Sequence, residues 1–277
     1  MPFTIFDPNM NKIDYPVGVT PLDFLVSAIE KERYIETVNG IPGNVNYGFD
    51  YKEREVTLNF WLRHYHGEHD QKLLKSELYA MLDSQPYFYV SDDRLPTRVL
   101  KLTVDESYLP DRINGSNIFT LEIKGQIIGI PFWQSRFTTQ HIQQYKYDAD
   151  NEMFGLGDNI HLDYLDYSFG NYEFDIWNGG NVDLDPRDMY IKYTLNNVTT
   201  NGNLTIENVT TGEIFVFKES LVNQTLYVNQ TKVNVGVVNR LRDSNRKFPT
   251  IKKGLNHFKI TNCSYSSIDI DFRFLWK

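Results

Sequence analysis

The stretch EVTLNFWL, residues 55–62, alternates polar and apolar side chains, and DQKLLKSELYAMLDSQP, residues 70–86, follows it with a different period. Alternation by two predicts a strand with one buried face, because successive side chains of a strand point to opposite sides of its sheet. The apolar residues of the second stretch recur at helical spacing. They predict a helix from about Asp70, as its N-cap, to Asp83, ended by Pro86. Together the two stretches indicate a sheet on which one amphipathic helix packs.

The same alternation returns along the chain and predicts strands near residues 100–104, 119–123 and 268–276. A second helix or an irregular segment is expected at residues 138–145. From Tyr190 onward the predicted strands are short and closely spaced, with hairpin turns at Asn201-Gly202 and Thr211-Gly212. The chain is therefore expected to be mainly β with one α-helix. Its N-terminal domain is a β-sandwich or barrel-like sheet packed with that helix, and its C-terminal domain is a β-sandwich.

The composition changes between residues 130 and 150, where a polar stretch without alternation follows Pro131-Phe132. A length of 277 residues suggests two domains at about 150 residues each. We place the boundary at about residue 140, which gives an N-terminal domain of residues 1–140 and a C-terminal domain of residues 141–277.

The charge balance argues against nucleic acid as a partner. With 28 basic and 36 acidic residues, the formal net charge is −8, which repels phosphate backbones. The densest basic stretch is interpreted as a solvated loop. It holds Arg240, Arg242, Arg246, Lys247, Lys252 and Lys253.

The N-terminus has no basic segment followed by an apolar run, so no signal peptide is expected, and no run approaches the ~20 apolar residues of a membrane span. One cysteine, Cys263, excludes an intrachain disulfide and is interpreted as a small core residue. Without a secretory signal, the N-x-S/T tripeptides are expected to be strands and turns rather than glycan sites. They begin at Asn197, Asn203, Asn208, Asn223, Asn229 and Asn262.

An ordered set of features in the first half resembles the N-terminal domain of siphophage distal tail proteins. A strand comes first, and the amphipathic helix, an aromatic strand, a polar turn and a closing strand follow. These features are Tyr51, Arg54, Val56, Leu58 and Phe60; Leu82; Pro86 to Val90; Asp92-Asp93 and Pro96; then Phe119, Leu121, Ile123 and Pro131-Phe132.

The second half is similar to the galectin-like C-terminal domain of the same family. The features are the stretch from Gly202 to Phe217, Phe248-Pro249, then Gly254, Asn256 and Phe258, and the terminal Phe272, Phe274 and Trp276. The stretch from Tyr147 to Asp185 matches least well.

The resemblance implies a structural, non-enzymatic protein of the virion, made in the host cytoplasm and placed at the distal tail or baseplate. Such proteins form a homohexameric ring that joins the tail-tube protein and the tape-measure protein to the tail-associated baseplate protein. The N-terminal domain makes the ring and the galectin-like domain projects outward. The family supplies no catalytic residue, cofactor or metal to carry over, and no membrane partner. It does not identify the ring-interface residues.

Several groups of side chains could have a chemical role instead of a structural one. His64, His66, Glu68 and His69 could bind a metal, although a solvated loop is favoured since their spacing fits no tight site. The acidic loops at Asp148–Asp150 and Asp158–Asp166 could bind Ca²⁺. The pairs Asp163 with Asp166, and Asp183 with Asp185, could serve a glycosidase. Gly155-Leu156-Gly157 is interpreted as a turn, and Tyr164 and Tyr167 could stack on sugars.

Two alternative functions remain open at this point. The C-terminal sandwich could be a carbohydrate-binding module that recognises host cell-wall polymers, or the chain could be a cell-wall hydrolase. Binding to host cell walls would favour the first, and release of reducing sugar would favour the second.

Overall fold

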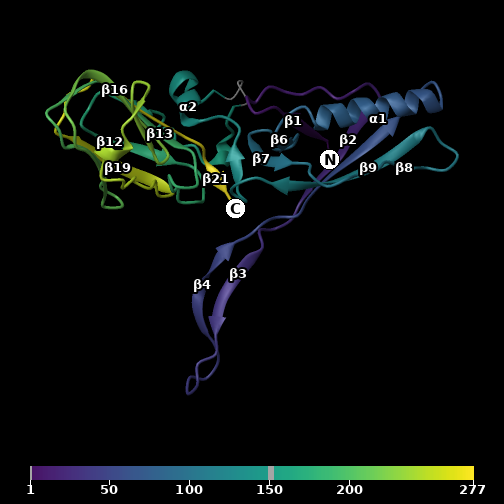
Figure 1. Cartoon of the computed structure of the whole chain (residues 1–277), viewed down its shortest axis with the longest axis horizontal. Helices are drawn as coiled ribbons and strands as arrows, with labels where there is room; N and C mark the ends of the chain where they lie inside the picture. Colours follow the sequence, from purple (N-terminus) through teal and green to yellow (C-terminus); the bar gives the residue numbers. More distant parts are fainter. Residues whose placement is uncertain (1, 149–152) are drawn as a thin grey trace. The chain divides into compact units, whose positions relative to one another are not determined.

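The computed structural model describes residues 2–148 and 153–277. Its chain forms two compact units, Met1–Phe132 and Trp133–Lys277 (Figure 1). The boundary expected near residue 140 lies within the helix α2, Thr139–Tyr145, which is the second helix or irregular segment of the sequence prediction. The strands that dominate both units confirm the prediction of a mainly β fold.

The first unit is built on one antiparallel sheet in the order β1-β6-β7-β9-β5-β2, with β8 paired to β9. The predicted strands near residues 55–62, 100–104 and 119–123 are confirmed as β5, β7 and β9. The bounds are β1 Phe3–Phe6, β2 Val19–Val26, β5 Val56–Arg63, β6 Phe88–Asp92, β7 Arg98–Thr103, β8 Asp111–Arg112 and β9 Ile118–Ile127.

The sheet of the first unit curls so that its two end strands share one core. Phe3 of β1 lies 5.9 Å from Phe24 of β2 and 5.1 Å from Phe60 of β5, measured between ring centroids. All three side chains are buried. The barrel-like arrangement therefore follows from the apolar face of each strand turning inward.

The amphipathic helix α1, Glu68–Leu82, is confirmed, but Asp70 is not its N-cap. Gly67 takes that place with a φ of 91°, and Asp70 lies inside the first turn. The Asp70 carboxylate instead accepts hydrogen bonds from the backbone N–H groups of Tyr65 (2.7 Å) and His66 (3.0 Å). These bonds hold the loop that enters the helix. Leu74, Leu78 and Leu82 form the buried face.

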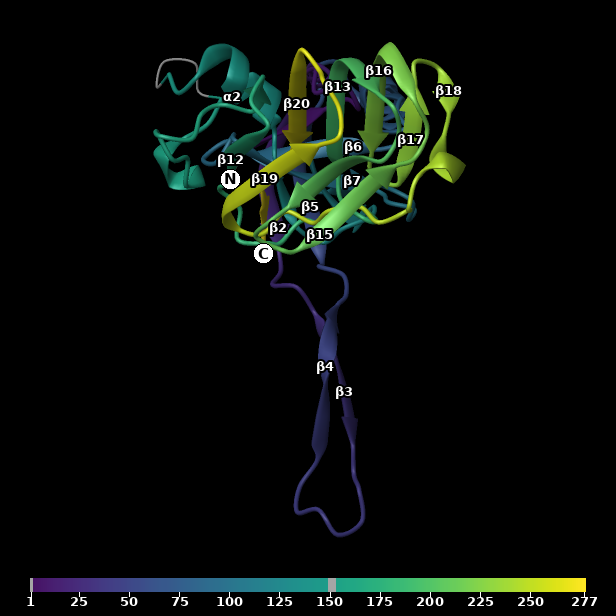
Figure 2. The ribbon, with the colours of Figure 1, turned by 90° about the vertical axis from the view of Figure 1, so that its left-hand side faces the viewer.

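A long hairpin leaves the sheet of the first unit between β2 and β5 (Figures 1 and 2). It consists of β3, Lys31–Glu36, and β4, Val45–Tyr51, and we call residues 31–51 the arm. The sequence pattern did not predict the arm, and the single strand predicted from Tyr51 to Phe60 is wrong. Tyr51 ends β4, Arg54 lies in a connection, and β5 begins at Val56.

The second unit holds two antiparallel sheets, ordered β11-β20-β13-β16-β17-β18 and β12-β19-β14-β15, while β10 pairs with β21. The bounds are β10 Trp133–Ser135, β11 Ser168–Phe169, β12 Glu173–Asn178, β13 Ile191–Thr200, β14 Leu204–Asn208, β15 Glu213–Phe217, β16 Leu221–Asn229, β17 Lys232–Val235, β18 Val238–Asn239, β19 Gly254–Thr261, β20 Ser267–Phe272 and β21 Leu275–Trp276, with 3₁₀ turns at Leu156–Asp158 and Leu241–Asp243.

The two sheets of the second unit face each other across an aromatic core, as the predicted sandwich requires. Phe174 of β12 stacks on Phe169 of β11, with ring centroids 4.3 Å apart. Tyr193 of β13 lies 6.0 Å from Phe258 of β19. No helix in the described residues is long and apolar enough to cross a membrane.

The predicted hairpin at Asn201-Gly202 is wrong, because β13 and β14 lie in different sheets. Gly202 instead sits where the chain crosses between the sheets, with a φ of 107°. A Cβ atom there would lie 2.6 Å from the carbonyl oxygen of Lys218, so only glycine fits. The second predicted turn, at Thr211-Gly212, does join the paired strands β14 and β15.

Candidate functional site

The arm exposes apolar side chains on both of its faces. Every residue of β3 is exposed. Among the large apolar side chains, Tyr34, Ile35, Ile41, Tyr47 and Phe49 are all exposed, and Tyr47 retains 63% of its accessible surface. A two-stranded ribbon is marginally stable alone in water, since it has no face on which to bury such groups. The arm is therefore a surface suited to contact with another chain.

The base of the arm is well anchored. The N–H of Lys52 donates to the carbonyl oxygen of Glu30 (2.9 Å), and the N–H of Glu30 donates to that of Glu53 (3.0 Å). Beyond this base, cations cover part of the aromatic surface. Lys31 Nζ lies 5.0 Å and the Arg33 guanidinium 5.5 Å from the Phe49 ring centroid. Such cation–π contacts favour an extended ribbon that stays in solution.

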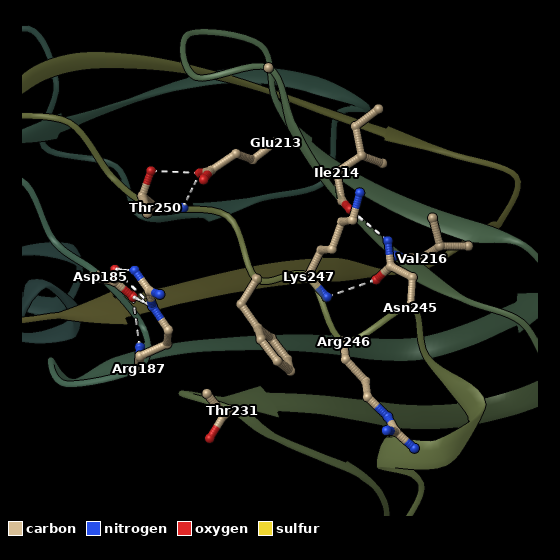
Figure 3. A pocket seen from close by; sticks show the side chains of 12 residues that line it. Asp185, Arg187, Glu213, Ile214, Val216, Thr231, Asn245, Arg246, Lys247 and Thr250 are labelled. Atoms are coloured by element: carbon tan, nitrogen blue, oxygen red, sulfur yellow. Dashed lines mark hydrogen bonds and ion pairs between the residues drawn. The ribbon is translucent and has the colours of Figure 1, made fainter.

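A second candidate site is a pocket of about 770 Å³ in the second unit (Figure 3). It lies where the outer edge of the strand β15 meets the segment that precedes β19. Four regions of the chain supply its walls, namely the connection between β12 and β13, the strand β15, the turn before β17, and residues 245–250. The lining includes Asp185, Arg187, Glu213, Ile214, Thr231, Arg246, Lys247 and Phe248.

The acidic groups of this pocket already form hydrogen bonds or ion pairs with neighbouring residues. Glu213 Oε2 accepts hydrogen bonds from the Thr250 N–H (2.7 Å) and hydroxyl (2.6 Å) and from the Thr211 hydroxyl (3.1 Å). Burial raises the pKa of Glu213, but these hydrogen bonds outweigh burial and hold the pKa below its ordinary value. Asp185 receives Arg187 Nε at 2.9 Å, and this guanidinium bond lowers the pKa of Asp185.

The histidine cluster does not form a metal site. His66 and His69 are exposed, whereas the ring of His64 packs 5.8 Å from that of Phe119. No group of three or more metal-ligating side chains gathers anywhere in residues 2–148 and 153–277.

The acidic candidates have separate partners and do not face one another as pairs. Asp166 pairs with Lys146, and Asp163 lies 3.7 Å from His161. Asp183 pairs with Lys252 at 3.0 Å, whereas Asp185 binds Arg187. Asp166, Asp183 and Asp185 are thus each held by a different basic side chain, which disfavours a cooperating acid–base pair. Of the Asp148–Asp150 loop, Ala149 and Asp150 lie outside the described residues.

Burial removes Tyr167 as a candidate for stacking on a sugar, whereas Tyr164 is only half-buried. Tyr167 is 1% exposed and its hydroxyl donates to the Trp177 carbonyl oxygen (2.7 Å), so it cannot stack on a sugar. Tyr164 is stacked on Trp177. The buried carboxylate of Asp158 accepts from the Gly155 N–H (2.9 Å), which makes residues 155–158 a closed turn.

Cys263 is half-buried rather than a core residue, and it lies in the turn after β19. The N-x-S/T asparagines are partly explained by backbone geometry. Positive φ angles, which asparagine tolerates better than most residues, occur at Asn197, Asn203, Asn223 and Asn262.

The comparisons with known proteins place this fold in a class. Residues 17–124 match the model of the phage tail protein RIFT-related domain. No curated protein sequence matches. The matched family is one of phage tail proteins, and the fold of the chain is shared with solved phage tail proteins.

Solved structures extend the likeness to the whole chain. The Dit protein of phage SPP1, described as a paradigm of the hub adsorption apparatus in phages that infect Gram-positive bacteria, is 12% identical with a TM-score of 0.68. The alignment covers 98% of this chain and 99% of that one. A chain of the phage P2 baseplate in its activated conformation with Ca is also 12% identical, with a TM-score of 0.52 and coverage of 100% and 98%. The predicted resemblance to siphophage distal tail proteins is confirmed.

Proposed function

We propose that the chain forms a homohexameric ring at the distal end of a siphophage tail, in which each arm is covered by a neighbouring subunit. The exposed apolar ribbon carries this proposal, because it buries its side chains only against another chain. One face of a subunit then meets a different face of the next, and such head-to-tail contacts close into rings. Residues 1–140 make the ring and residues 141–277, a galectin-like sandwich, project from it.

The ring joins the tail-tube protein and the tape-measure protein to the tail-associated baseplate protein. Its work is mechanical connection, for which matched surfaces are needed and a catalytic group is not. The fold shared with SPP1 Dit over nearly the full length of both chains supports this assignment.

Excision of the arm tests the ring. Joining Glu30 to Lys52 through an Asn-Gly turn removes residues 31–51 and retains the hydrogen bond between those two residues at the base. In light scattering after size exclusion, the wild type should assemble as six copies of the 32.5 kDa chain, either by itself or when mixed with assembled tail tubes. The excised variant should remain monomeric with an unchanged melting temperature.

A matched pair of substitutions separates the arm from general surface apolarity. Ile35→Asp with Tyr47→Asp should prevent ring formation, whereas Val222→Asp with Val237→Asp, at exposed positions of the second unit, should not. Rings formed by the excised variant would refute the role of the arm. A wild type that stays monomeric even with tail tubes would refute the ring itself.

A further inference from the structure

We propose that the pocket in the second unit binds a carbohydrate polymer that carries anionic groups. The inference concerns only this pocket, and it holds whether or not the chain forms a ring. It rests on three features: the unpaired cations, the satisfied carboxylates and a half-buried aromatic ring.

The cations come from the loop that borders the pocket. Arg246 and Lys247 are both exposed, and no described residue forms an ion pair with either. Their side chains extend from the loop in opposite directions (Figure 3). Two positive groups held apart in this way suit successive anionic groups along a polymer better than a single small anion.

The local charge is positive although the protein carries −8. Asp185 is neutralised by Arg187 within the pocket wall. Glu213 is committed to Thr250 and Thr211 through three hydrogen bonds. An anionic ligand therefore meets Arg246 and Lys247 without displacing an existing partner, and the fixed carboxylates remain acceptors for ligand hydroxyl groups.

The aromatic wall is Phe248. Its ring lies 5.8 Å from that of Phe215, at an interplanar angle of 28°, and this contact fixes its orientation. Phe248 is only half-buried, so part of the ring remains at the pocket. A flat apolar face beside hydrogen-bonding groups matches a sugar ring, which has an apolar face of C–H groups and a polar rim.

Nucleic acid would also satisfy a cation beside an aromatic ring, but the overall charge disfavours it. A nucleic-acid backbone carries a phosphate at every nucleotide, and a chain of net charge −8 repels such density. A polysaccharide with spaced anionic groups places charge mainly at the two cations. The same chemistry fits phosphate or carboxylate groups, and the choice of probe distinguishes them.

Calorimetric titration of the full chain tests the site with four probes: a phosphate-bearing phosphomannan fragment, an oligogalacturonate, a neutral dextran oligosaccharide and the oligonucleotide dT10. At least one of the two acidic oligosaccharides should bind, and the one that binds identifies the anionic group. Dextran and dT10 should bind at least about tenfold more weakly, which corresponds to the loss of one charge-assisted hydrogen bond.

Variants of equal charge provide the control. Arg246→Gln with Lys247→Gln should weaken binding about tenfold or more. Arg242→Gln with Lys253→Gln, at exposed positions outside the pocket lining, should leave the affinity unchanged. Phe248→Leu, which retains apolar packing on Phe215, should also weaken binding.

Four outcomes would overturn the proposal. They are absence of binding by both acidic oligosaccharides, equal binding of dextran, equal binding of dT10, and equal loss of affinity in the two charge variants. Equal loss of affinity in the two charge variants would show that binding depends on the general surface charge and not on this pocket.

Discussion

Asn245 pairs with Val216 as a neighbouring strand would. The Asn245 backbone N–H donates to the Val216 carbonyl oxygen (3.0 Å), and the Asn245 side-chain oxygen accepts from the Val216 N–H (3.0 Å). The side-chain N–H₂ also donates to the Ile214 carbonyl oxygen (2.8 Å). One side chain thus satisfies backbone groups at the edge of β15 that would otherwise be open to pairing with another chain.

Replacing Asn245 with alanine should therefore lower the free energy of unfolding of the second unit by about 1–2 kcal/mol, since all three hydrogen bonds of its side chain, to Val216, Ile214 and Lys247, are lost. Chemical denaturation measures the change. Asn171→Ala, at an exposed position before β12, is the control and should have an effect within about 0.5 kcal/mol. Equal effects of the two substitutions would show that Asn245 does not protect this edge.

The docking of α1 depends on Leu78, which is fully buried. Leu78→Ala should cost about 2–5 kcal/mol, because removing a large core side chain leaves a cavity. Leu73 lies on the same helix but is 52% exposed, so Leu73→Ala should cost about 0.5 kcal/mol or less. Hydrogen exchange of peptides from α1 should rise in the first variant alone. Similar protection in both variants would contradict the assigned helix face.

Glu213 predicts a pH dependence of stability. Its pKa in the folded chain lies below the ordinary value of 4.5, so its carboxylate stabilises the fold above pH 4.5 and loses this effect as the pH falls through the lowered pKa. Glu213→Gln should lower the melting temperature at pH 7, and the difference from the wild type should shrink towards pH 3. Glu219→Gln, at an exposed position, should not show this pattern.

The thiol of Cys263 should react slowly. Burial raises its pKa to about 11, and the thiolate is the reactive form. At pH 8 its modification by Ellman's reagent should be about 100-fold slower than in the urea-unfolded chain. Because the chain has a single cysteine, the absorbance change reports this thiol alone. Equal rates with and without urea would contradict the assigned burial.

Strands with one buried face could be predicted from the sequence, and strands without a buried face could not. Val56, Leu58 and Phe60 alternate because β5 has a core on one side only. The arm exposes all of β3 and most of β4, so no buried face imposes a period on its sequence. The predicted hairpin at Gly202 failed for another reason. A glycine that relieves a close approach to Lys218 has the same local signature as one in a tight turn.

The pocket was equally hidden from sequence reasoning. Asp185, Glu213 and Arg246 lie far apart along the chain, and only the packing of the sandwich brings them to one site. The basic stretch was a visible signal. Its interpretation as solvated holds for its exposed side chains, but the sequence did not show that Arg246 and Lys247 border a cavity.

The arm also has a consequence for the interval between synthesis and assembly. An uncovered ribbon with open edges invites indiscriminate pairing with any other extended chain. Lys31 and Arg33, which lie over the Phe49 ring, oppose this because they mask part of the apolar surface of the arm. A newly made subunit can thus wait in solution without aggregating, and the same cations must be accommodated by whatever surface finally receives the ribbon.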